Sequence, residues 1–260
     1  MLKGLYTAYT GMVNEQRRMD VLTNNLANAN TNGYKKEGAT SQAFDDVLAF
    51  KIKDMSEGRG SARALGINNL GVKIGEGYTD YSQGPVKGTE NPFDLALSGE
   101  GFFEVQYMNR EGETSTKYTR DGSFTMNAQG YLVTHDGDFV INTTGARIRL
   151  DPELDFRVDT SGNIMQGDEN SPVTTIRIRD FVDYDYLEKF GENYYQTVDG
   201  YRFQDATAKV NQGYLETSNI SVVTEMTNMI NVSRAYETNQ KVIQTYDSSL
   251  EIAVNQLGKL

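Results

Sequence analysis

The single histidine of the chain, His135, stands beside two carboxylates in the run His135-Asp136-Gly137-Asp138. Imidazole and carboxylate groups in such a cluster can ligate a metal ion or transfer protons. An Asp-Gly dipeptide, however, is typical of the tight turn that joins two antiparallel strands. We therefore expect a hairpin tip here, and we predict neither a catalytic residue nor a metal ligand.

Glu100 directly precedes the strand-like run GFFEV (101–105), and Glu104 lies within it. The two form a second candidate pair of catalytic carboxylates. Glycosidases cleave sugars with two carboxyl groups that lie about 5–9.5 Å apart. Alternation along one strand would place these two on the same face but about 13–14 Å apart, which is too far. Carboxylates from different strands stay open, so a cell-wall hydrolase with helical docking segments is kept as the alternative function.

The composition of the chain excludes several classes of function. The 260 residues include 25 basic and 36 acidic side chains, and the net charge of −11 argues against a nucleic-acid partner. Without cysteine there is no disulfide, thiol nucleophile or Cys-ligated zinc, and we expect no cofactor and no enzymatic activity. The sequence contains no run of 18 apolar residues, so we predict no insertion into a membrane. The N-terminus turns polar too early for a cleaved signal peptide.

Residues 1–34 contain no proline and predict one long helix that assembles with other elements. Its apolar side chains follow a nearly unbroken pattern of steps of four and three, with Gln16 in the remaining slot, which is the spacing of a coiled-coil seam. We expect the helix to end at Asn32-Gly33, because glycine suits the left-handed backbone that terminates helices. The seam residues are Leu5, Tyr9, Met12, Met19, Leu22 and Leu26.

Residues 211–260 show the same pattern, with neither proline nor glycine between Asn219 and Leu257. For the N-terminal helix on its own, six buried seam side chains recover about 12 kcal/mol at about 2 kcal/mol each, whereas ordering the backbone costs roughly 1–2 kcal/mol per residue. One stripe against one partner is therefore marginal, and we expect both termini to pair and then pack with other subunits. The C-terminal stripe contains Val222, Met226, Met229, Tyr236, Ile243, Leu250, Val254 and Leu257.

Residues 91–210 are rich in short β-branched and aromatic runs separated by turn residues, which predicts an antiparallel all-β domain. Asp121-Gly122 and Asp136-Gly137 are hairpin dipeptides within it. Residues 35–90 predict an extended or irregular connecting segment. The expected fold class is α+β, with long terminal helices forming a coiled-coil-like assembly domain around a central β-domain.

Four stretches resemble the signatures of one family, the bacterial flagellar rod and hook axial proteins. They are NNLANANTNGY (24–34), NPFDLALSGEGFFEV (91–105), YTRDGSF (118–124) and GYLETSNISVVTEMTNMINVSRAYETNQKVI (213–243). Within the family, GENYYQ (191–196) and GYLETSN are most similar to the distal rod members. The alternative within the family is a proximal rod or hook-like protein.

The resemblance implies a structural subunit that is exported by the flagellar type III apparatus and polymerises into a hollow helical tube in the basal body. That tube transmits motor torque to the hook and passes exported subunits. The partners implied are other copies of the chain, neighbouring rod and hook proteins, and the export apparatus. To the N-terminal seam the resemblance adds, as assembly residues, Asn24, Asn25, Asn28, Asn30, Asn32 and Gly33. To the C-terminal stripe it adds Ile230, Arg234 and Glu237.

Overall fold

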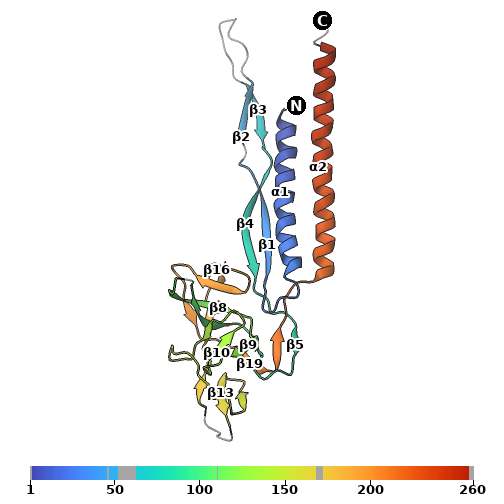
Figure 1. The fold of residues 1–260 in the computed structure, drawn as a ribbon. Helices are drawn as coiled ribbons and strands as arrows, with labels where there is room; N and C mark the ends of the chain where they lie inside the picture. The colour runs from blue at the N-terminus through green and yellow to red at the C-terminus, as the bar shows by residue number, and fades with distance from the viewer. Residues whose placement is uncertain (1, 46, 52–62, 110, 168–171, 258–260) are drawn as a thin grey trace. The chain divides into compact units, whose positions relative to one another are not determined.

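The computed structural model describes residues 2–45, 47–51, 63–109, 111–167 and 172–257 (Figure 1). The chain divides into two compact units, each assembled from separate stretches. The helical unit contains Met1–Ala27, Glu37–Asp80 and Ser221–Leu260. The β unit contains Asn28–Lys36 and Tyr81–Ile220.

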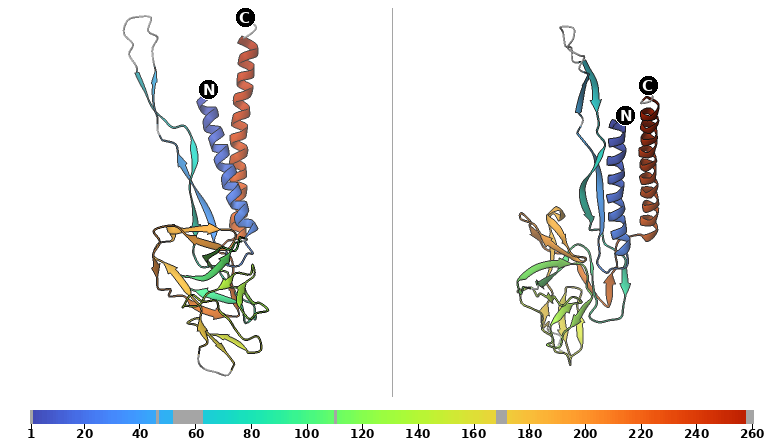
Figure 2. Two further views of the ribbon diagram at one scale, coloured as in Figure 1. Left: turned by 60° about the vertical axis from the view of Figure 1, so that its left-hand side comes forward. Right: turned by 45° about the horizontal axis from the view of Figure 1, so that its top comes forward.

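The helical unit contains two α-helices, α1 (Leu2–Ala27) and α2 (Val222–Leu257), which lie side by side in all views (Figures 1 and 2). They run antiparallel, because Gly4 of α1 lies against Tyr246 of α2 and Gly11 lies against Asn239. A Cβ atom on Gly4 would lie 2.8 Å from Cζ of Tyr246, so the absent side chain makes room for the tyrosine ring. Within the described residues, neither helix has the length and apolar character that a membrane span needs.

Four strands complete the helical unit, and we call them the ribbon: β1 (Lys36–Ala43), β2 (Val47–Lys51), β3 (Arg63–Asn68) and β4 (Val72–Asp80). β1 pairs with β4, and β2 pairs with β3 in antiparallel register. The β1–β4 part of the ribbon packs along α1, where Asn14 Nδ2 donates to Ser41 Oγ of β1 at 3.1 Å. Gly71, at φ +116°, brings the ribbon backbone against the Thr10 side chain.

The prediction of a coiled-coil-like domain built from the two terminal segments is wrong, although the α+β class is correct. Within the described residues, the only α-helices are α1 and α2, and they share their unit with the ribbon. Knobs-into-holes packing needs an apolar side chain at each seam position. Gly4 and Gly11 provide none where α1 faces α2, while Tyr9 and Met226, assigned to the seams, are 54% and 49% exposed.

The β unit is an antiparallel assembly of short strands. Its largest sheet has the order β16-β17-β8-β7-β11-β10-β9, and β15 joins β7 to β18. Its members are β7 (Phe102–Met108), β8 (Thr114–Thr119), β9 (Phe124–Met126), β10 (Leu132–Thr134), β11 (Phe139–Val140), β15 (Ile178–Phe181), β16 (Leu187–Phe190), β17 (Tyr194–Thr197) and β18 (Phe203–Gln204).

Smaller sheets flank the large one, with β12 (Phe156–Val158), β13 (Asn163–Gln166) and β14 (Thr174–Thr175) forming one of three strands. β6 (Leu95–Ser98) pairs with β19 (Lys209–Gln212). β5 (Val86–Gly88) pairs with β20 (Tyr214–Glu216), and a 3-10 turn spans Tyr184–Tyr186.

The core of the β unit is a cluster of aliphatic and aromatic side chains that includes Leu95, Phe103, Phe124, Ile164 and Val210. A second cluster is aromatic and gathers around Phe102, whose ring packs edge-on against Tyr81. Burying several such side chains, each worth about 1.5–3 kcal/mol, stabilises the unit.

Of the two predicted hairpin dipeptides, one forms a hairpin. Asp136-Gly137 joins β10 to β11, with Gly137 at φ +94° and Thr134 N donating to Asp138 O at 2.8 Å. Asp121-Gly122 does not, because β8 and β9 on either side of it are not paired. Gly122 O instead accepts from Leu95 N at 3.0 Å, which ties the loop to β6.

Candidate functional site

The predicted N-terminal assembly residues occupy α1 and the turns that follow it. Leu5, Met12, Met19, Leu22 and Leu26 are half-buried on the helix, while Tyr9 and Asn24 are exposed. Asn25 is fully buried, and its amide both donates to Glu37 O at 2.8 Å and accepts from Glu37 N at 3.0 Å. Beyond the helix, Asn28 and Asn32 are half-buried, Asn30 is exposed and Gly33 is buried.

The predicted C-terminal assembly residues are distributed around α2. Met229, Tyr236, Ile243 and Leu250 are half-buried, whereas Val222, Met226, Ile230, Arg234 and Glu237 are exposed. The side chain of Leu257 lies outside the described residues. Apolar side chains are therefore left on the surface, with Met226 at 49% and Ile230 at 53% exposure.

Three of the quoted motifs meet inside the β unit. Gly33 N donates to Glu216 O at 2.8 Å, which joins the N-terminal motif to β20. A Cβ atom on Gly33 would lie 2.6 Å from the backbone carbonyl carbon of Arg120, so only glycine fits at this position. Its φ of +67° adds a second reason, since that conformation is costly for other residues. Lys36 N donates to Asn219 Oδ1 at 2.8 Å on the same side.

A buried ionic cluster, which we call the junction, lies at this meeting point and consists of Lys35, Arg120 and Glu216. Lys35 Nζ lies 2.5 Å from Glu216 Oε1, and Arg120 Nη1 lies 3.3 Å from Glu216 Oε2. The three side chains are at most 3% exposed. Gly84 N also donates to Glu216 Oε1 at 2.9 Å, and Lys35 Nζ donates to Ser82 O at 2.8 Å. A buried carboxylate so satisfied holds three distant segments together.

Aromatic and polar contacts surround the junction. The Lys189 ammonium lies 3.8 Å from the centre of the buried Tyr34 ring, and the Arg120 guanidinium lies 5.2 Å from that of Phe102. Next to Arg120, burial raises the pKa of the Asp121 carboxyl from its ordinary value, although the Ser123 amide donates to it at 3.0 Å.

The residues predicted from the sequence do not include Lys35, Arg120 or Glu216. Arg120 and Glu216 stand inside the quoted motifs YTRDGSF and GYLETSN, and Lys35 follows NNLANANTNGY directly. Charged residues inside these motifs are the sequence feature that could have indicated the cluster. The sequence does not indicate which charges pair, because Lys35 and Glu216 are 181 positions apart.

The two candidate enzymatic sites have structural roles. Glu104 pairs with Arg177 at 3.0 Å and Arg179 at 3.4 Å, which neutralises its charge inside the β unit. Asp138 is buried and accepts from Tyr194 Oη at 2.8 Å, and burial raises the pKa of Tyr194. Among the described residues, no three His, Asp or Glu side chains gather as they would around a metal ion.

Three family models match the chain. They are described as the flagella basal body rod protein (residues 5–35), the flagellar hook protein FlgE/F/G D1 domain (residues 96–171) and the flagellar basal body rod FlgEFG protein C-terminal (residues 211–257). The first and last of these contain most of α1 and α2, and the middle one covers much of the β unit.

Curated relatives match over nearly the whole length. The chain is 33% identical to the flagellar hook-basal body complex protein FlhO of Bacillus subtilis, with all of both chains covered. It is 34% identical to the flagellar basal-body rod protein FlgF of Caulobacter vibrioides, again over both full chains. It is 33% identical to the rod protein FlgG of Buchnera aphidicola subsp. Schizaphis graminum, over 96% of this chain and 98% of that one. The chain therefore belongs to the flagellar basal-body rod protein family, whose members are structural proteins of the basal body and not enzymes.

Proposed function

We propose that this chain is a subunit of the distal rod and that it polymerises through α1 and α2 into a hollow helical tube. The tube transmits motor torque to the hook, and exported subunits pass through it. An open-ended tube requires head-to-tail contacts between unlike surfaces, since a symmetric contact closes on itself.

The observation that carries this proposal is the apolar surface left on both helices. Tyr6 and Tyr9 of α1 are 63% and 54% exposed, and Val223 and Ile230 of α2 are 77% and 53% exposed. The two tyrosines are three positions apart and the two α2 residues seven, so each pair lies on one face of its helix, and exposed apolar faces mark interaction sites. Copies of the chain and neighbouring rod and hook proteins are the partners that would cover it.

The predicted assembly residues take different parts in this proposal. The exposed ones, Tyr9, Val222, Met226 and Ile230, would contact other subunits directly. Asn25 and Gly33 would act from within the subunit, by fixing the end of α1 and the chain that follows it. Export through the type III apparatus is part of the same proposal, and the absence of cysteine agrees with passage of an unlinked chain.

The distal position is favoured by the motifs GENYYQ and GYLETSN over a proximal rod or hook-like position. The relatives named FlgG, FlgF and FlhO match at nearly equal identity, so position has to be tested directly. Basal bodies isolated from cells that lack this chain should retain a proximal rod and stop short of the distal segment. Basal bodies with an intact distal rod, or with no rod at all, would contradict the distal assignment.

A further inference from the structure

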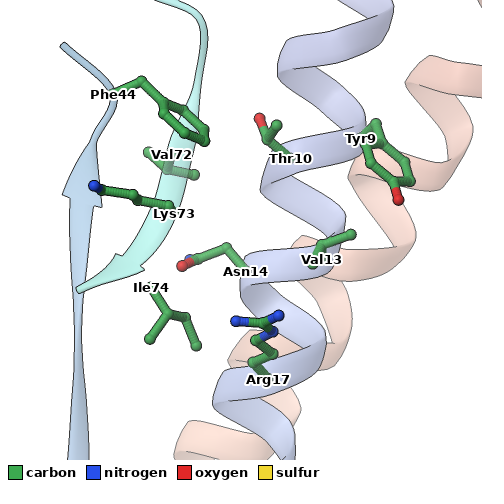
Figure 3. Close-up of a pocket in the computed structure, with 9 residues that line it drawn as sticks. All are labelled: Tyr9, Thr10, Val13, Asn14, Arg17, Phe44, Val72, Lys73 and Ile74. Atoms are coloured by element: carbon green, nitrogen blue, oxygen red, sulfur yellow. The ribbon is translucent and has the colours of Figure 1, made fainter. Parts of the chain in front are cut away.

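The helical unit contains a groove between α1 and the ribbon, and Figure 3 shows its inner part. Its outer part is a cavity of about 340 Å³ lined by Lys3, Tyr6, Thr10, Phe44 and Leu70. A second cavity of about 180 Å³ continues from Thr10 and Phe44 toward Arg17. Figure 3 shows Thr10 and Asn14 on the side of α1 that faces Phe44 and Ile74. We call the two cavities together the groove.

All charged side chains that line the groove are basic. They are Lys3, Arg17 and Lys73, and within the described parts of the chain none of them forms an ion pair. Tyr6 and Leu70 at the groove are 63% and 42% exposed. The groove therefore suits a ligand segment that is apolar and negatively charged.

The end of α2 has this complementary character. Tyr246 lies against Gly4, so in antiparallel register Ser248 is level with Leu2, the first residue of α1. Residues 249–257 therefore extend past α1, as Figure 1 shows, over roughly 13 Å at 1.5 Å per residue. We call residues 247–257, which are this extension and the two residues before it, the overhang.

The overhang carries apolar and acidic side chains on its surface. Ile252 and Val254 are 56% and 69% exposed, and its charged residues are Asp247 and Glu251. Asp247, Glu251 and Val254 follow at steps of four and three, so they form one stripe along the helix. Within the described residues, neither acid forms an ion pair.

We propose that the overhang of one copy docks in the groove of a second copy, with Val254 in the apolar cavity and the acids near the basic rim. The groove lining extends from Lys3 to Arg17, about 21 Å along α1, which is long enough for the overhang. Among the described residues that line the two cavities none belongs to α2, so the groove of one copy is open to the α2 of another. The contact joins unlike surfaces and can repeat without closing. The docking inference rests on the proposed self-assembly, and it identifies the two surfaces that would meet between copies.

The test is chemical crosslinking between two differently tagged full-length copies, which the absence of native cysteine makes specific. One copy carries Leu70→Cys and the other Val254→Cys, and a short bis-maleimide reagent is added to the mixture. We expect a crosslinked product that contains both tags. The controls are Glu76→Cys, exposed on β4 away from the groove, and Thr227→Cys, exposed near the other end of α2. Pairs that contain a control should give at least about tenfold less product.

A charge exchange tests the electrostatic part. Arg17→Glu or Asp247→Lys alone should each weaken association about tenfold, since an attraction is replaced by a repulsion. The two variants mixed together should recover association, because the opposite charges meet again across the contact. No recovery would contradict the placement of Asp247 beside Arg17.

The outcomes separate this inference from the proposed function. Tubes that form without the Leu70–Val254 product overturn the docking inference and leave self-assembly in place. The product without any tube supports the docking and contradicts the tube. Equal product from the control pairs overturns the docking, as does capture of the overhang only by a different axial protein.

Discussion

Lys35 and Glu216 are 181 positions apart, yet Lys35 Nζ lies 2.5 Å from Glu216 Oε1 with both side chains buried. Lys35 belongs to the segment that follows α1, and Glu216 to the strand that precedes α2. The ion pair therefore ties the segment that follows α1 to the strand that precedes α2, inside the β unit. Arg120, from a third segment, pairs with the other oxygen of the same carboxylate.

Removing the carboxylate of the junction should destabilise the β unit strongly. Glu216→Gln removes the carboxylate that pairs with both Lys35 and Arg120 in a buried site, and we expect a loss of about 3–5 kcal/mol. Urea unfolding, monitored by tyrosine fluorescence, measures this change in the free energy of unfolding. The matched control is Arg18→Ala, which breaks the exposed Glu15–Arg18 pair and should cost less than about 1 kcal/mol. Equal losses in both variants would contradict a structural role for the junction.

Gly33→Ala should destabilise the protein through two effects, strain at φ +67° and a clash with the backbone of Arg120. Gly191→Ala is the control that distinguishes the two effects, because Gly191 has a similar φ of +69° but no atom lies within 4 Å of an added Cβ. We expect about 1 kcal/mol for Gly191→Ala from the backbone alone. Gly33→Ala should cost at least about 2 kcal/mol more. Similar unfolding midpoints for the two variants would show that the chain does not pass so close to Arg120.

The pKa of Asp121 sets a pH dependence with a defined sign. Burial raises this pKa above its ordinary value of 3.8, so the folded protein holds the proton more tightly than the unfolded chain. The resulting stability is present at low pH and is lost as pH rises through the folded pKa. Asp121→Asn should therefore gain stability relative to the parent protein between pH 3.5 and pH 7.

Urea midpoints of both proteins at the two pH values measure the effect. The control is Asp151→Asn, an exposed carboxylate that accepts from the amide two residues on, as Asp121 does. A parent-to-variant difference for Asp121→Asn that is the same at both pH values would contradict the buried environment.

Asn25→Ala should destabilise the helical unit. The side chain is fully buried, and the substitution removes the two hydrogen bonds that it makes to the backbone of Glu37. Each such bond contributes about 0.5–1.5 kcal/mol. Thr23→Ala, which removes an exposed hydroxyl bonded within α1, is the control. Amide exchange at β1 should rise in Asn25→Ala alone, and unchanged exchange would argue against this role.

The extent to which sequence predicted the structure depends on how local the signal was. The helices and the β-rich middle follow from periodicity and turn residues, and the Asp136-Gly137 hairpin needs only its own neighbours. The α1–α2 contact was not predictable in detail, because Gly4, Gly11 and Asn239 meet there without any hydrophobic signal. The junction was not predictable because Lys35, Arg120 and Glu216 come from three distant segments, and periodicity carries no information on such pairs.

The central claim is that the chain assembles into a tube through apolar surface left on its helices, and electron microscopy of the purified protein tests it most directly. The parent protein at increasing concentration should form hollow tubes. Ile230→Asp should remain a folded monomer with unchanged circular dichroism, because Ile230 is 53% exposed and supports no core. Asn231→Asp, which adds the same charge one residue further along α2, should still form tubes. A parent protein that stays monomeric at every concentration, or tubes formed equally by Ile230→Asp, would contradict the account.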